Sequence, residues 1–149
     1  MYGLTVNTVI EGSQKMKIDG GCHCGHLTYE AEIDLEQVGV CHCRDCQTFS
    51  GSAFRGFAPA LEGTFKLLSG EPNRYLKTAA SGHVNAMVFC PNCGTHICST
   101  GAEPGSTFFG IRTGTIRQSN ELRPKVQIFC RSAQDWVWDL GSVPKHDAG

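Results

Sequence analysis

Long apolar runs are missing from this sequence, and so is an excess of positive charge. No stretch approaches the ~20 apolar residues that a membrane-spanning helix requires, so no membrane association is expected. The 13 Lys and Arg residues are balanced by 14 Asp and Glu residues, which leaves a formal charge of −1. Binding to the phosphate backbone of nucleic acids needs clustered positive charge, whereas Lys and Arg are scattered here. The sequence therefore disfavours nucleic acid as a partner.

Sustained helical periodicity is also lacking, whereas glycine is frequent, with 18 residues. The segment 26–33 alternates apolar and polar residues as a half-buried strand does. Further strands are expected at 52–58, 63–68, 74–78, 83–89, 95–99, 107–111 and 125–129. A short helix is expected after Cys43, ending near Gly51, and a second short turn at 133–138. This pattern predicts a mostly β fold in one domain.

The N-terminal residues show none of the features of a secretory signal, so a cytoplasmic location is expected. In a reducing compartment the nine cysteines would remain thiols, and an odd number cannot all pair within one chain. Metal ligation therefore explains the cysteines better than a disulfide framework does. Cys130 is interpreted as a small buried apolar residue, because it follows an apolar run and has no neighbouring cysteine. Cys98 is left unassigned.

Seven cysteines form closely spaced C-x-C and C-x-x-C motifs, namely Cys22, Cys24, Cys41, Cys43, Cys46, Cys90 and Cys93. In an extended C-x-C both sulfurs lie on one side, so the intervening His23 and His42 are expected to point away. A C-x-x-C turn lets two thiolates hold one tetrahedral ion. A redox role is disfavoured because the sequence lacks the βαβ pattern of thioredoxin-like proteins.

Counting ligands suggests two zinc sites. Two doublets can supply one four-sulfur site, formed by Cys22, Cys24, Cys90 and Cys93. This leaves the triplet Cys41, Cys43 and Cys46, and three protein ligands keep one position of a zinc ion open to water or substrate. Alternatively, Cys98 or a histidine closes the triplet, and both sites are then structural. Spacing alone leaves both arrangements open.

Three stretches, 20–25, 41–47 and 89–96, resemble the glutathione-dependent formaldehyde-activating enzyme family, also called the GFA or CENP-V domain family. The resemblance covers residues 20–144, with 1–19 as an N-terminal extension and 145–149 as a C-terminal tail. It implies a β-tent fold of small antiparallel sheets organised around zinc, with two Zn²⁺ ions per chain. By analogy, the four-cysteine set holds a structural zinc and the triplet holds a second, potentially catalytic one. Many members have a histidine where this chain has Gln127.

The resemblance also implies an enzymatic function. The expected activity is that of a zinc-dependent carbon–sulfur lyase or synthase, acting on a glutathione–aldehyde adduct such as S-hydroxymethylglutathione, with a small thiol such as glutathione as partner. A lyase acting on another thiol adduct is also possible. The alternative is a non-enzymatic zinc-binding interaction module in which both metals are structural. Side chains near the sites that could assist chemistry, none with an assigned catalytic role, are Arg44, Gln47, Thr48, Ser50 and His96.

Overall fold

The computed structural model describes residues 14–149, which form two β-sheets, one α-helix and several 3-10 turns. The smaller sheet has the strand order β1-β2-β5, with β1 (Lys15–Gly21), β2 (Thr28–Asp34) and β5 (Lys66–Ser69). The larger sheet has the order β10-β3-β4-β9-β8-β7-β6. Its strands are β3 (Gly39–Cys41), β4 (Arg55–Pro59), β6 (Asn73–Thr78), β7 (Val84–Phe89), β8 (His96–Gly101), β9 (Phe109–Arg112) and β10 (Val126–Ile128).

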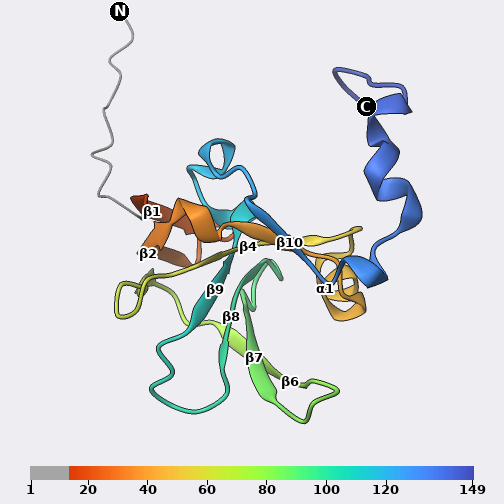
Figure 1. Ribbon diagram of the computed structural model, residues 1–149. Coiled ribbons are helices and arrows are strands. Elements are labelled where there is room, and N and C mark those ends of the chain that lie inside the picture. Colours follow the sequence, from red (N-terminus) through yellow and green to blue (C-terminus); the bar gives the residue numbers. More distant parts are fainter. Residues whose placement is uncertain (1–13) are drawn as a thin grey trace, which may run out of the picture.

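The predicted mostly β fold is confirmed, and antiparallel pairing prevails. The exception is β10, which pairs with β3 in parallel. Each of the eight predicted strands overlaps a strand of the structure, whereas β1 and β3 were not predicted. Strand β1 has a mostly polar sequence, and β3 is only three residues long, so neither gives a strong alternating signal. In Figure 1, β6 to β9 extend away from the level of β4 and β10.

The hydrophobic core joins the two sheets. On β2 the predicted alternation holds, since Tyr29, Ala31 and Ile33 are buried, whereas Glu30 is exposed. These side chains share one core cluster with residues of the larger sheet, among them Ile111 on β9. The two sheets therefore fold as one unit and hold the turns at their edges in fixed positions.

The α-helix α1 (Arg44–Ser50) follows β3 directly and confirms the predicted short helix. The Sγ atom of Cys43 caps its N-terminus by accepting a hydrogen bond from the Cys46 N–H at 3.3 Å. At the other end, Gly51 adopts a left-handed conformation with φ of 62°, which glycine tolerates without steric cost. An ion pair of 2.7 Å between Asp45 and Lys77 attaches α1 to β6.

The C-terminal residues form the 3-10 turns η4 (Cys130–Ser132) and η5 (Asp135–Ser142), and this segment stands away from the sheets on the side of α1 (Figure 1). The prediction that Cys130 is buried is wrong, because its side chain is exposed. The preceding Phe129 has a φ of 54°, which turns the chain away from β10 before the cysteine is reached. No helix in the described part of the chain is long and apolar enough to span a membrane.

Candidate metal centres

The turns of two hairpins bring four cysteines together at one edge of the fold. The first turn joins β1 to β2 and the second joins β7 to β8, and together they contribute Cys22, Cys24, Cys90 and Cys93. The four Sγ atoms all lie within 4.8 Å of one another. The Sγ atom of Cys24 lies 3.6 Å from that of Cys22 and 3.8 Å from that of Cys90. A tetrahedral zinc with bonds of about 2.3 Å separates its sulfurs by about 3.8 Å, so this set has the shape of a four-thiolate site.

Backbone N–H groups also point at these sulfurs. The Leu27 N–H donates to Cys22 Sγ at 3.2 Å, and the Asn92 N–H donates to Cys90 Sγ at 3.4 Å. A hydrogen bond with the Thr95 hydroxyl, at 3.1 Å, is the main cause that lowers the pKa of Cys93 to about 5. Hydrogen bonds that favour the charged form of a sulfur prepare it as a metal ligand. The donor set therefore fits a divalent, thiophilic metal such as zinc.

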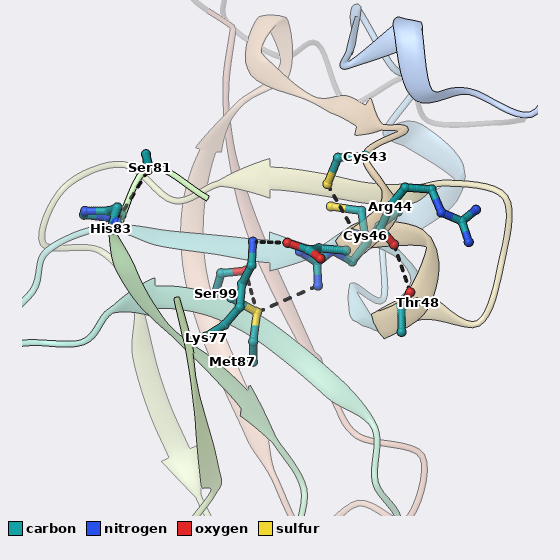
Figure 2. A network of polar contacts seen from close by, with 11 residues as sticks. Cys43, Arg44, Cys46, Thr48, Lys77, Ser81, His83, Met87 and Ser99 are labelled. Carbon is teal, nitrogen blue, oxygen red and sulfur yellow. Dashed lines mark hydrogen bonds and ion pairs between the residues drawn. The ribbon is translucent and has the colours of Figure 1, made fainter. Parts of the chain in front are cut away.

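The triplet lies at the junction of β3 and α1. Cys41 is the last residue of β3, Cys43 caps the helix and Cys46 lies in its first turn. Their Sγ atoms lie within 4.8 Å of one another. Figure 2 shows the sulfurs of Cys43 and Cys46 close together at the start of the helix. Cys41 and Cys46 are buried whereas Cys43 is partly exposed, so solvent reaches this cluster on the Cys43 side.

The residues that the sequence left as possible fourth ligands lie elsewhere. Within residues 14–149, neither cysteine cluster includes Cys98 or a histidine. Cys98 is buried in the hydrophobic core. The His42 ring is buried and its Nε2 atom lies 2.9 Å from Oε1 of Gln127. The side chain of His23 is exposed. Within the described residues, the triplet thus brings together three sulfurs, one fewer than a closed four-thiolate zinc site has.

Two buried arginines that sequence reasoning missed lie beside the triplet. Arg55 and Arg112 are only 8% and 9% exposed. A hydrogen bond from the Cys41 thiol, and then the positive charges of both arginines, lower the pKa of Cys46 to about 5 against the opposing effect of burial. Burial lowers the pKa of Arg112 to about 10, so its guanidinium remains protonated at neutral pH. The interior next to the triplet is therefore strongly positive.

His96 lies next to Arg55 and is influenced by the charge of Arg112, and its imidazole is neutral at neutral pH. Its Nδ1 atom accepts a hydrogen bond from Arg55 Nη1 at 3.3 Å, and its Nε2–H donates to the Cys98 carbonyl at 3.2 Å. Burial, followed by the charges of Arg112 and Arg55, lowers its pKa to about 4. Both ring nitrogens are thus occupied, and the imidazole is better suited to orienting Arg55 than to exchanging protons.

This shifted pKa predicts a pH dependence of stability. In the unfolded chain His96 takes up a proton near its ordinary pKa of 6.5, but in the folded protein only near 4. Between these values the unfolded state binds more protons, so the free energy of unfolding should fall as the pH is lowered from about 6.5 towards 4. Urea unfolding of wild type and His96→Gln at several pH values tests this, with zinc content measured at each. The variant should lose less stability over this interval; an equal loss would contradict the assignment.

The other side chains considered as helpers make structural contacts. The Gln47 amide donates to the His42 carbonyl at 2.7 Å and to the Ser132 carbonyl at 3.0 Å, which attaches the C-terminal segment to α1. The Thr48 hydroxyl donates to the Arg44 carbonyl. The Ser50 hydroxyl likewise bonds backbone carbonyls. These residues shape the helix and its surroundings, and none has a free group directed at the sulfurs.

An open groove runs along α1 and could receive a small peptide-like molecule. It has a volume of about 710 Å³ and lies between the helix, the loop that follows it and the C-terminal segment. Arg44 lines this groove, as do Phe54 and Trp136. Figure 2 shows the Arg44 side chain extending away from the sulfurs of Cys43 and Cys46. The groove is also lined by Gln47 and Thr48 of the same helix, whereas none of the triplet cysteines belongs to its lining.

Known proteins resemble this chain in sequence. The family model of the glutathione-dependent formaldehyde-activating enzyme matches residues 17–132. A protein of Schizosaccharomyces pombe described as an uncharacterized lyase is 29% identical over 77 residues, which are 52% of this chain and 53% of that protein. The chain thus spans about half the length of this curated relative.

A solved structure from Rhodobacter sphaeroides has a similar fold. It superposes with a TM-score of 0.52 at 20% identity, covering 66% of this chain and 87% of the other. The family match covers most of the chain and includes all seven clustered cysteines. The chain therefore belongs to the glutathione-dependent formaldehyde-activating enzyme family.

Proposed function

We propose that this protein is a zinc-dependent carbon–sulfur lyase or synthase that forms or cleaves a glutathione–aldehyde adduct such as S-hydroxymethylglutathione. The observation that carries the proposal is the pairing of a complete four-cysteine cluster with a three-cysteine cluster that lacks one ligand. A four-thiolate zinc is structural, whereas a three-ligand zinc keeps a position for a reactant. The family match and the name of the lyase relative support a lyase-type activity.

In the proposed reaction, the sulfur of glutathione and the carbon of formaldehyde form one C–S bond. The thiol releases its proton, the carbonyl π-electrons move to oxygen, and this oxygen takes up a proton from water; cleavage is the reverse. Zn²⁺, when bound, keeps a thiol deprotonated near neutral pH and stabilises the developing negative charge. Cys41, Cys43 and Cys46 would hold it, and the partly exposed Cys43 marks the side from which the reactants arrive.

The groove beside α1 would bind the rest of the glutathione molecule. Glutathione carries two carboxylates, and an arginine can bind a carboxylate through two parallel hydrogen bonds. Arg44, which is exposed and lines the groove, is suited to this contact. The location that goes with this function is the cytoplasm, where glutathione is reduced and free thiols persist.

The proposal is tested by following ¹³C-formaldehyde and glutathione by NMR exchange measurements. Zinc-loaded wild type should accelerate formation and breakdown of the adduct above the uncatalysed rate, and Cys43→Ser should not. Cys130→Ser is the matched control, because Cys130 is an exposed cysteine outside both clusters, and it should keep full activity. No acceleration by wild type with two bound zinc ions would refute the proposal.

The alternative function is a non-enzymatic zinc module that binds a macromolecule. It is favoured by the exposed apolar side chains of the C-terminal segment, including Trp136, Trp138 and Leu140. In that case both metals would be structural, and glutathione should not bind to the triplet. Calorimetric titration of reduced glutathione into zinc-loaded protein separates the two functions. If the enzyme proposal holds, S-methylglutathione should bind at least about ten-fold more weakly than glutathione. It has no thiol and therefore cannot bind the metal as a thiolate.

A further inference from the structure

The two buried arginines beside the triplet have no carboxylate partner. Three ion pairs occur within residues 14–149, and neither Arg55 nor Arg112 takes part in them. The Nε atoms of both guanidinium groups are buried without a hydrogen-bond acceptor. A buried positive charge is costly unless a negative charge compensates it. The missing negative charge must therefore come from something else that lies against these side chains.

The strand register places both arginines on the triplet's side of the larger sheet. Arg55 lies directly opposite Cys41 on the neighbouring strand, and Phe57, two residues along, lies opposite Arg112. In an antiparallel pair, residues that lie opposite one another project to the same face, and so do residues two apart on one strand. Cys41, Arg55 and Arg112 thus share a face, which agrees with the effect of both charges on Cys46.

The remaining partners of these guanidinium groups are neutral. Arg55 donates to His96 Nδ1 and to the sulfur of Met87, and Arg112 donates to the Ser99 hydroxyl. Figure 2 shows Met87 and Ser99 on adjacent strands next to the end of α1 that carries Cys46. The nearest carboxylate on the helix, Asp45, is paired with Lys77. The negative charges available to the arginines are consequently the cysteine sulfurs of the triplet.

A count of charges then separates the possible fourth ligands. Three thiolates and one divalent metal carry −1, so with the two arginines the buried ensemble carries +1. A neutral fourth ligand leaves this excess in place, whereas a thiolate brings the total to zero. The four-cysteine cluster needs no such compensation, because Cys24 and Cys93 are exposed and water solvates its negative charge.

We propose that Arg55 and Arg112 make the triplet site selective for an anionic fourth ligand, so that it accepts the sulfur of its substrate as a thiolate in preference to a neutral ligand. The inference rests on the proposed function in one respect, namely that the triplet holds a divalent metal with an open position. Both arginines act through charge, from a distance, as positioning residues and not as metal ligands.

The test compares an anionic and a neutral ligand on cobalt-loaded protein, in which the ligand-to-metal absorption reports the fourth ligand. The probes are 2-mercaptoethanol, which has no carboxylate to bind Arg44, and imidazole. Arg55→Gln and Arg112→Gln should each weaken 2-mercaptoethanol binding by about ten-fold or more. Each removes a positive charge whose attraction for the bound thiolate is only partly screened at an effective dielectric of about 20. Imidazole binding should stay the same or become tighter. Arg123→Gln removes an exposed arginine and should change neither.

Equal weakening of both probes, or no change in either, would overturn the inference. Should the glutamine variants fail to fold, Arg55→Lys and Arg112→Lys decide the question. They keep the positive charge but lose the planar shape of the guanidinium, so 2-mercaptoethanol affinity should stay close to that of wild type. A ten-fold loss would contradict a role through charge. Wild type that binds 2-mercaptoethanol tightly but leaves formaldehyde and glutathione unreacted would refute the proposed function and leave this inference standing.

Discussion

Cys90→Ser should leave most of the protein unfolded at 25 °C. Cys90 is fully buried and belongs to the cluster that joins the β1–β2 turn to the β7–β8 turn. Structural zinc in small domains contributes about 10–16 kcal/mol of binding free energy, whereas the net stability of a domain is only about 5–15 kcal/mol. Losing one of the four ligands weakens this binding, and losing even part of so large a contribution can exceed the whole stability of the fold. Circular dichroism and zinc analysis of the purified variant measure this effect.

The matched control for this prediction is Cys130→Ser. It removes a sulfur from the same protein, but from an exposed position outside both clusters, so its melting temperature should equal that of wild type. A Cys90→Ser variant that melts at the wild-type temperature with its zinc content unchanged would show that the four-cysteine set is not a structural metal site.

Cys43→Ser should have the opposite combination of effects, with the fold retained and binding lost. We expect the zinc content to fall from two ions to one, because the triplet has no spare ligand to replace the lost sulfur. Glutathione binding should weaken by more than about 100-fold, since altering even the outer partners of a metal ligand costs about 10–100-fold in metal affinity. The far-ultraviolet circular dichroism spectrum should remain that of wild type, apart from a loss at the N-terminus of α1, where Cys43 is the cap.

Zinc analysis and glutathione calorimetry on the same sample distinguish the possible outcomes. Two bound zinc ions in Cys43→Ser would exclude the triplet as the second site. One zinc ion together with unchanged glutathione affinity would keep the metal assignment but place the thiol elsewhere.

The sequence predicted the parts of the site that depend on local spacing. The cysteine motifs, the short helix and its end at Gly51 all follow from residues a few positions apart, and the structure has each of them. The sequence also predicted which distant cysteines lie together, because a site with four ligands can be built from two pairs of closely spaced cysteines. Such local features can be predicted from sequence, because the conformation of a turn or a helix cap is determined by the residues within it.

The residues that the sequence did not reveal depend on strand pairing. Arg55 and Arg112 are ordinary polar residues in their own strands, and only the register of β3 with β4 and of β4 with β9 places them beside Cys41. The available signal was that Arg55 and the apolar Phe57, two residues apart, lie on the same face of one strand. This spacing does not tell which strand lies opposite. Cys130 was misplaced for a related reason, since a single left-handed residue, Phe129, redirects the chain.

The parallel pairing of β10 with β3 has a consequence for the order in which the surroundings of the two clusters can form. Every residue of the four-cysteine cluster has been synthesised by the end of β8, whereas β3, which ends in Cys41, gains its second neighbour only with residues 126–128. Contacts between residues far apart in the chain form late, because closing a long loop costs entropy before the pairing repays it. During synthesis on the ribosome, the four-cysteine cluster can thus come together while β3, which carries Cys41, is paired only with β4. Strand β3 gains its final neighbour in the larger sheet only when β10 has been synthesised.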